Sequence, residues 1–359
     1  MKIPYLSLYD VTSQHREEIR AAVIRVAESG WYLLGEEVRA FEREYAEYTH
    51  REYCIGCGNG LDALTLILRG YMELGMIKEG DEVIVPANTY IASILAISEC
   101  RLTPVLVEPR IETLLIDDEE IESHITKRTK AVMLVHLYGY NAYTERVERI
   151  CREKNLLLIE DCAQAHGNVS PHVGIRGAQA YSFYPGKNLG ALGDGGCVTT
   201  SDMALAESVR AIANYGSSRK YVFEYKGCNS RLDEIQAAVL RVKLHYLDSE
   251  NERRKEIARK YIRGIKNNEV TLPPADGVFH IFPMLCRYRE KMQKHLTEKG
   301  IGTMIHYPIP PHKQKAYSEW NSMTLPITEK IHREELSLPC NQTMTDEDVE
   351  YVIDSVNEG

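Results

Sequence analysis

Lys187 and Asp161 are the two residues whose types and settings point most directly to chemistry. Lys187 lies between a glycine and an asparagine, in the turn-prone stretch 182–196 that separates two segments expected to be strands. Asp161 ends the apolar run 156–161, which is typical of a buried strand that delivers an acid at its carboxyl end. Because ligands of open α/β sheets bind at that end of the strands, we expect both side chains to face one ligand.

A lysine and an acid in this arrangement suit pyridoxal phosphate (PLP). The lysine would bind the aldehyde carbon of the cofactor, and the acid would keep its pyridine nitrogen protonated. Each residue alone has a simpler interpretation, since most lysines are solvated surface charges and an acid after a strand is often a helix N-cap. Their order along the chain and the glycine-rich setting of Lys187 favour the cofactor.

Other residues are suited to a planar, phosphorylated cofactor. The turn at Asn59 and Gly60 leads from a strand into a helix, and the free amides of a helix start attract phosphate. Ser182 has a hydroxyl suited to a phosphate oxygen. Tyr90 follows a strand end and could stack on a ring, and Gln164 could donate to a phenolic oxygen. The turn is neither a Walker A loop nor a GxGxxG fingerprint, so those routes to nucleotide binding are not expected.

Strands and helices are expected to alternate over about two-thirds of the chain. Apolar strands are predicted at 52–57, 83–85, 105–107, 131–135 and 156–159, and helices at 16–27, 36–48 and 61–68. Strands that are apolar on both faces belong to a mostly parallel sheet covered by helices. After residue 227 we expect a long helical stretch over 231–255, a strand at 278–285, and helices at 290–299 and 345–356. These patterns predict an α/β protein with a large domain over 1–245 and a smaller C-terminal domain over 246–359.

The composition excludes several classes of function. A net charge of −9 argues against nucleic acid, which requires a basic face. No run of 18 apolar residues and no leader-like start are present, so we expect no membrane span and a cytoplasmic protein. Nine cysteines, an odd number, indicate reduced and mostly buried thiols. Cys54 and Cys57 have CxxC spacing without a second ligand pair, so we expect them to pack in the core and predict no metal site.

Three long motifs resemble the DegT/DnrJ/EryC1/StrS family of sugar aminotransferases. They are EDCAQAHG at 160–167, SFYPGKNLGALGDGG at 182–196 and YKGCNSRLDEIQ at 225–236. Similar stretches at 30–35 and 306–310 extend the resemblance over essentially the whole chain. The resemblance implies the fold-type I architecture of PLP-dependent transferases, like that of aspartate aminotransferase, in a homodimer with shared active sites.

The same resemblance implies roles for individual residues. It makes Lys187 the Schiff-base lysine, Asp161 the partner of the pyridinium nitrogen and Gln164 the ligand of the ring hydroxyl. Tyr90 would cover the ring face. The phosphate would be held by Asn59, Gly60 and Ser182, with Asn229 of the partner subunit reaching into the site.

Within the family, the motifs look most like the subset that aminates C3 of nucleotide-linked 3-keto-6-deoxyhexoses. By that likeness the substrate is a thymidine diphosphate (dTDP) keto sugar and the amino donor is L-glutamate. The product would be a dTDP-3-amino-3,6-dideoxyhexose for lipopolysaccharide O-antigen or another glycan. The residues implied at the sugar are Tyr184, His306 and Tyr307, together with Tyr32 and Lys220.

Four alternatives to this activity stay open. The chain could aminate C4 of a 4-keto sugar, act as a PLP-dependent sugar dehydratase, or be a non-catalytic regulator with the same fold. It could also be a nicotinamide-dependent sugar enzyme, which the missing GxGxxG fingerprint disfavours. The dehydratase branch resembles this chain but looks to have a histidine in place of Lys187. A regulator would have no reason to keep Lys187, Asp161, Gln164 and Ser182 together. The stretch 168–177 is shorter than the family's usual hairpin, which leaves substrate contacts in that region open.

Overall fold

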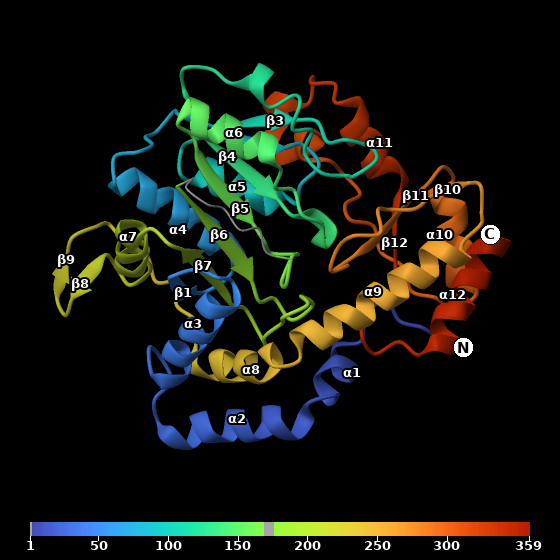
Figure 1. Ribbon diagram of the computed structural model, residues 1–359, viewed down its shortest axis with the longest axis horizontal. Coiled ribbons are helices and arrows are strands. Elements are labelled where there is room, and N and C mark those ends of the chain that lie inside the picture. Colours follow the sequence, from blue (N-terminus) through green and yellow to red (C-terminus); the bar gives the residue numbers. More distant parts are fainter. Residues whose placement is uncertain (1, 169–175) are drawn as a thin grey trace.

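The computed structural model describes residues 2–168 and 176–359 of the chain. A large sheet lies at the centre of the molecule, and a smaller sheet lies to one side, near both chain termini (Figure 1). The long helix α9 (Leu247–Gly264) extends between the two regions.

The large sheet has seven strands in the order β1-β7-β6-β5-β4-β2-β3. Its strands are β1 (Tyr53–Cys57), β2 (Glu82–Pro86), β3 (Thr103–Val107), β4 (Thr129–Val135), β5 (Leu157–Asp161), β6 (Gly177–Ser182) and β7 (Gly196–Thr200). All neighbours are parallel except β7, which is antiparallel to both β1 and β6. The mostly parallel sheet predicted from the sequence is therefore confirmed.

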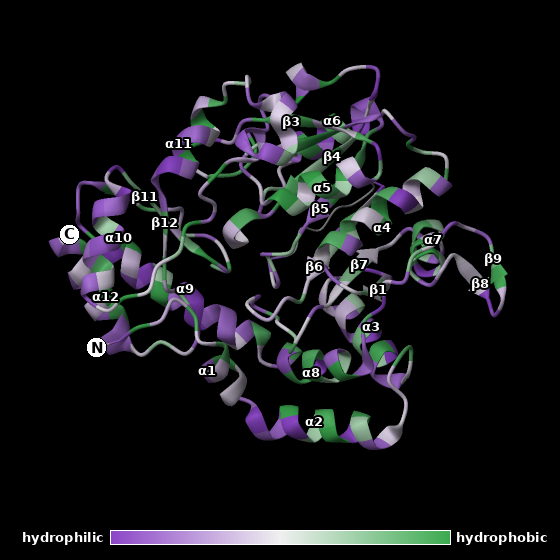
Figure 2. Ribbon diagram, turned by 180° about the vertical axis from the view of Figure 1, so that it is seen from behind, coloured by the Kyte–Doolittle hydropathy of each residue, from purple (hydrophilic) through white to green (hydrophobic). Residues whose placement is uncertain are grey.

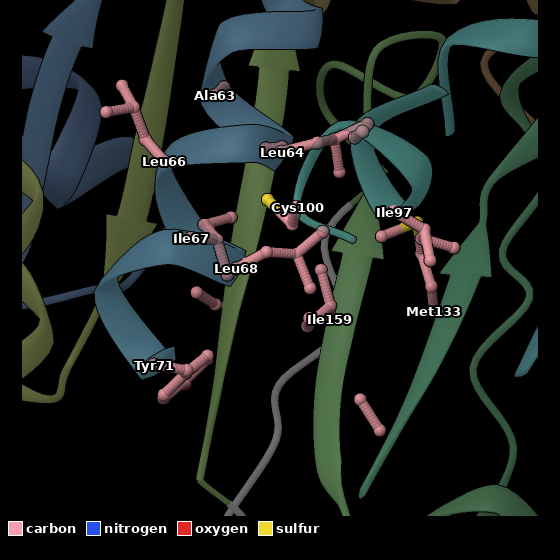
Figure 3. Packing of buried hydrophobic residues seen from close by; sticks show 14 of the residues in the cluster. Ala63, Leu64, Leu66, Ile67, Leu68, Tyr71, Ile97, Cys100, Met133 and Ile159 are labelled. Carbon is pink, nitrogen blue, oxygen red and sulfur yellow. The ribbon is translucent and has the colours of Figure 1, made fainter. Parts of the chain in front are cut away.

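Helices cover both faces of this sheet. Along β2, Val83 and Val85 pack in the core under α4, α5 and α7, whereas Ile84 packs on the opposite face with α6. Figure 3 shows the first of these cores, in which the side chain of Leu68 of α4 lies close to Ile159 of β5. Strands buried on both faces explain the continuous apolar runs in the sequence.

The helices begin and end where the local sequence favours it. Thr144 caps the start of α6 by accepting from the Val147 amide, and Asn155 ends the helix in the left-handed conformation. Figure 2 shows hydrophobic and hydrophilic residues mixed along α2 and α8, as expected for helices with one buried face. The helices of the large region are α1 (Leu8–Ser13), α2 (Arg16–Ser29), α3 (Glu36–Tyr48), α4 (Gly60–Glu73), α5 (Ile91–Glu99), α6 (Glu145–Lys154), α7 (Met203–Ala213) and α8 (Glu234–Leu244).

The smaller sheet is antiparallel and has the order β10-β11-β12. Its elements are β10 (Val270–Thr271), β11 (Phe282–Cys286) and β12 (Glu335–Leu338), with helices α10 (Arg289–Glu298), α11 (Pro326–Glu334) and α12 (Asp346–Glu358). The N-terminus joins this region, because Ile3 donates to Gly300 O and accepts from Gly302 N. The core here also contains Ile3 and Tyr138, so the second region includes residues from before the predicted boundary at 245.

Short elements complete the fold. They are the hairpin β8 (Ser217–Arg219) and β9 (Val222–Phe223), and the 3-10 helices η1 (Glu122–His124), η2 (Leu137–Gly139), η3 (Pro311–Lys313) and η4 (Lys315–Trp320). No helix in the described ranges is long and apolar enough to cross a membrane. All nine cysteines are free thiols and only Cys228 is not fully buried, so the packing role predicted for Cys54 and Cys57 is confirmed.

Two predicted elements differ from the structure. The single helical stretch over 231–255 is wrong, because α8 and α9 are separate helices with a break at 245–246. Tertiary contacts stabilise the break between the two helices, because the ring of Tyr246 stacks on His15 and its hydroxyl donates to Glu18. The strand predicted at 278–285 is shorter and begins at 282, since residues 278–281 instead bond to the backbone of η2. The family departure at 168–177 falls largely on 169–175, outside the described residues.

Candidate active site

One cavity of about 840 Å³ lies at the carboxyl ends of the parallel strands. It brings together residues that lie far apart in the sequence, from Tyr5 to Asn341. The predicted residues that line it are Asn59, Gly60, Tyr90, Asp161, Gln164, Ser182, Tyr184, Lys187, His306 and Tyr307. The pairing of Lys187 with Asp161 expected from their order along the chain is thus present in one cavity.

Lys187 lies on the connection between β6 and β7. This connection is tied at its base, because Phe183 N donates to Gly195 O at 2.7 Å and Ala191 N donates to Phe183 O at 2.8 Å. The Lys187 amide donates to Tyr184 O at 2.8 Å, which fixes the turn from which the side chain extends. Burial lowers the pKa of Lys187 to about 8, although Asp161 opposes the shift. The amine is therefore more easily neutral, and more nucleophilic, than a surface lysine.

Asp161 ends β5 with a buried carboxylate that accepts two hydrogen bonds. Its Oδ2 accepts from Ser93 Oγ at 2.8 Å, and its Oδ1 accepts from the Ala163 amide at 3.1 Å. Burial raises the pKa of Asp161, whereas these two hydrogen bonds and Lys187 act in the opposite direction. No cation forms a salt bridge with Asp161 among residues 2–168 and 176–359. A buried acid of this kind suits a protonated ring nitrogen.

The start of α4 and the end of β6 form an anion-binding corner. Asn59 caps α4, because its Oδ1 accepts from the Asp62 amide at 2.8 Å. A Cβ on Gly60 would lie 2.6 Å from Ser182 Cβ, so only glycine permits this close approach. The approach places the Ser182 hydroxyl beside the first amides of the helix, which have no intrahelical acceptor. The Ser182 hydroxyl, the first amides of α4 and the dipole of this helix together favour the binding of a phosphate group.

Gln164 and two tyrosines form another wall of the cavity. Gln164 Oε1 accepts from the Tyr138 amide at 2.5 Å, and its Nε2 donates to Tyr307 Oη at 3.0 Å. The rings of Tyr90 and Tyr307 lie 4.9 Å apart. Tyr90 therefore presents an aromatic surface beside the amide of Gln164. An anion corner, an aromatic wall, a buried acid and a lysine are the groups that PLP requires, so the residues present fit this cofactor.

Three predicted residues lie away from the cavity. Tyr32 is exposed and its hydroxyl donates to Ala27 O at 3.3 Å. Lys220 lies at the tip of the β8–β9 hairpin, 5.3 Å from the ring of Tyr221. Asn229 is exposed near the base of the same hairpin. Their roles in the site stay predictions, and that of Asn229 requires a second subunit.

Sequence reasoning missed several residues of the cavity and its supports. The local signal for Ser93 is its position four residues after Thr89, which is the spacing of one helical turn. In the structure the two hydroxyl groups lie 2.9 Å apart. Tyr5, His280 and Asn341 also line the cavity but come from distant parts of the chain, where no motif marks them. Outside the cavity, the buried side chains of His136, Glu160 and Cys162 have ligand atoms within 4.8 Å of one another; the prediction of no metal site stays untested.

Comparison with known proteins identifies the family of this site. Residues 13–357 match the DegT/DnrJ/EryC1/StrS aminotransferase family. The chain belongs to this family. The resemblance of the three motifs is thereby confirmed, and the matched region contains every predicted site residue. Lys187, Asp161 and the anion-binding corner line one cavity, which is compatible with PLP chemistry.

Named relatives of this aminotransferase act on nucleotide sugars. The chain is 54% identical to "dTDP-3-amino-3,6-dideoxy-alpha-D-galactopyranose transaminase" of Aneurinibacillus thermoaerophilus, covering 99% of each chain. It is 44% identical to "dTDP-3-amino-3,4,6-trideoxy-alpha-D-glucose transaminase" of Streptomyces venezuelae, covering 99% of this chain and 96% of the relative.

Solved structures agree with the fold and the cofactor. The S. venezuelae DesV structure in complex with a ketimine intermediate has a TM-score of 0.95 and 44% identity, covering 99% of this chain and 98% of that one. The ntda structure from Bacillus subtilis, with bound cofactor PMP, has a TM-score of 0.93 and 29% identity. The match covers 99% of this chain and 85% of that one. The fold-type I prediction is confirmed, and the protein is a PLP-dependent aminotransferase.

Proposed function

We propose that this aminotransferase moves the amino group of L-glutamate to C3 of a dTDP-linked 3-keto-6-deoxyhexose. The product would be a dTDP-3-amino-3,6-dideoxyhexose. The observation that carries the proposal is the convergence of Lys187 and Asp161 on one cavity of about 840 Å³. The name of the relative at 54% identity supports the sugar, the amination at C3 and the nucleotide.

Bound PLP would serve as an electron sink that makes the hydrogen next to the amino group acidic. Lys187 then carries the proton between donor and cofactor carbons, and its pKa of about 8 lets it act as base and as acid near neutral pH. Asp161 would hold the proton of the ring nitrogen. Ser182 and the amides at the start of α4 would hold the phosphate, and Tyr90 would cover the ring.

The sugar would lie on the side of the cavity lined by Tyr184, His306 and Tyr307. Tyr184 is more than half exposed, as expected for a side chain that a ligand covers. We propose that the protein acts in the cytoplasm as a homodimer in which Asn229, Tyr32 and Lys220 serve the cavity of the partner subunit. Their exposure and their absence from the cavity of their own chain support this arrangement.

The absorbance of the purified protein tests the first half of the reaction. Bound PLP should give a visible band that L-glutamate bleaches, and Lys187→Ala should abolish both the band and turnover. Lys294→Ala, at a side chain that is 80% exposed, is the control and should behave like the wild type. Full activity in Lys187→Ala would refute the proposal.

The second half-reaction separates the alternatives. The bleached enzyme should regain its visible band with a dTDP-3-keto-6-deoxyhexose and release a 3-amino sugar. Recovery only with a 4-keto sugar would assign amination at C4 instead. A protein that binds PLP but responds to no amino donor and no keto sugar would be a regulator.

A further inference from the structure

A chain of three side chains connects the sugar side of the cavity to a buried carboxyl group in the small sheet. His306 Nδ1 contacts Ser337 Oγ at 2.8 Å, and Ser337 Oγ in turn is hydrogen-bonded to Glu335 Oε1. Glu335 and Ser337 lie on β12 and are fully buried, whereas His306 lines the cavity. The three residues therefore form a hydrogen-bonded path from the cavity into the protein.

The backbone decides where a proton on Glu335 can lie. Glu335 Oε2 accepts from the amide of His306 at 2.5 Å, so a protonated carboxyl group carries its hydrogen on Oε1, facing Ser337. A serine hydroxyl has one hydrogen, and a neutral imidazole has one N–H and one acceptor nitrogen. Two arrangements of the chain are therefore consistent with all three contacts.

In the first arrangement Glu335 is ionised. Ser337 donates to Glu335, and His306 Nδ1–H donates to Ser337, which leaves Nε2 as an acceptor. In the second arrangement Glu335 is protonated and donates to Ser337, and Ser337 donates to His306 Nδ1. The imidazole then carries its hydrogen on Nε2. No hydrogen bond engages Nε2 among residues 2–168 and 176–359, so this nitrogen is available to a ligand.

The surroundings let both arrangements occur near neutral pH. Burial raises the pKa of Glu335 to about 8, with its hydrogen bonds and Arg289 acting in the opposite direction. Arg289 of α10 does not bond the carboxylate but donates to His332 O. Burial and Lys187 lower the pKa of His306 to about 4, so its ring is neutral in both arrangements.

The groups around Glu335 do not titrate near neutral pH, so Glu335 is the residue of the three-residue path that changes its protonation there. The tyrosine hydroxyls that its charge influences belong to Tyr5, Tyr138 and Tyr307, and all three have pKa values raised above the usual range of tyrosine. On the paired strand β11, the facing residue is Leu285, which carries no charge.

We propose that Glu335, acting through Ser337, sets the tautomer of His306 and stores a proton for the sugar half of the reaction. The inference rests on the proposed function, because amination of a keto sugar expels the keto oxygen as water. As that oxygen leaves, His306 Nε2–H gives it a proton, Ser337 returns a proton to Nδ1, and Glu335 gives its proton to Ser337. Glu335 ends ionised, and the reverse sequence restores its proton.

The tautomer can be measured without turnover. In the PLP-loaded protein labelled with ¹⁵N-histidine, the ring signals of His306 should change from Nε2–H at pH 6.5 to Nδ1–H at pH 9.5, with a midpoint at about 8. His306→Asn assigns the signals among the 12 histidines. A tautomer that stays the same over this range in the wild type would overturn the proposal.

Two variants test the path itself. Glu335→Gln keeps both contacts and donates to Ser337, so it should hold His306 as Nε2–H at every pH. Ser337→Ala breaks the path and should make the tautomer independent of the Glu335 titration. Both should slow the sugar half-reaction at least tenfold while the glutamate half-reaction changes less than threefold. Equal slowing of both halves, or a Glu335→Gln tautomer that still follows pH, would refute the relay.

These outcomes are distinguishable from failure of the proposed function. If the sugar is wrong, no half-reaction with the keto sugar occurs in the wild type, but the titration of the His306 tautomer is still present. If the relay is wrong, the wild type turns over normally and the tautomer does not respond to Glu335.

Discussion

Replacing Gly60 by alanine should weaken cofactor binding through a purely steric effect. Gly60 is the first residue of α4 and does not have the positive φ that favours glycine, so alanine is compatible with its backbone. The added Cβ would lie 2.6 Å from Ser182 Cβ and 3.2 Å from Ser182 Cα. Both atoms are fixed to the strand, and no side-chain rotation can relieve the contact.

The size of the effect follows from the distances. Carbon atoms prefer separations of about 3.5–4.0 Å, so α4 and the end of β6 must move apart by roughly 1 Å. That movement separates the Ser182 hydroxyl from the amides of α4, and a hydrogen bond to a charged group contributes about 1.5–3 kcal/mol. Loss of one such bond corresponds to about a ten- to hundredfold weaker affinity for PLP. Overpacking should also destabilise the fold by about 1–3 kcal/mol.

Titration of the apoprotein with PLP, followed by the visible band, measures the affinity. Gly186→Ala is the matched control, because its Cβ would lie at ordinary contact distances, 3.5 Å or more from its neighbours, on the same cavity. PLP affinity in Gly60→Ala within threefold of the wild type, together with an unchanged urea midpoint, would refute the reasoning that this corner holds the phosphate.

Three further predictions concern the supports of the site and fold. Ser93→Ala removes a donor to Asp161, so the pKa of Asp161 should rise and the acidic limb of the kcat profile should shift to higher pH. Glu234→Gln should lower the unfolding free energy in urea by about 2–4 kcal/mol, because the carboxylate accepts three amide hydrogens at the start of α3. The pKa of Glu335 is about 8 in the folded protein, above its ordinary value of 4.5. Its ionisation therefore destabilises the fold as the pH rises from 4.5 to about 8. Glu335→Gln should therefore gain stability relative to the wild type between pH 5 and 9, on the order of 4 kcal/mol, and a constant difference over that range would contradict this.

The parts of the site that lie on contiguous motifs could be predicted from the sequence. Lys187, Asp161 and the Asn59–Gly60 turn are each marked by local composition, because strands and glycine-rich turns position them directly. The apolar runs predicted the parallel sheet for the same reason, since burial on both faces leaves a local pattern.

The remainder depends on contacts between distant segments. Nothing in the sequence around Glu335 or Ser337 indicates that β12 lies behind His306, because that contact arises from packing of the small sheet. The break between α8 and α9 was missed since helical periodicity continues across it, and contacts of Tyr246 with α2 decide the outcome. Tertiary packing often overrides local propensity in this way.

The reversed direction of β7 has a consequence for how this enzyme can change. In a purely parallel sheet, a loop at the ligand edge leads into a helix that must cross to the opposite edge before the next strand. Here the chain leaves β6 at the ligand edge and re-enters β7 at that same edge, joined by the Phe183–Gly195 bond. Residues 184–194 are thus a segment with both ends anchored at one place. Within the segment, Asn188, Gly190 and Leu192 bond to α8 or α9, so its length is constrained by both helices. A different reactive side chain at position 187 itself could be exchanged without moving a helix.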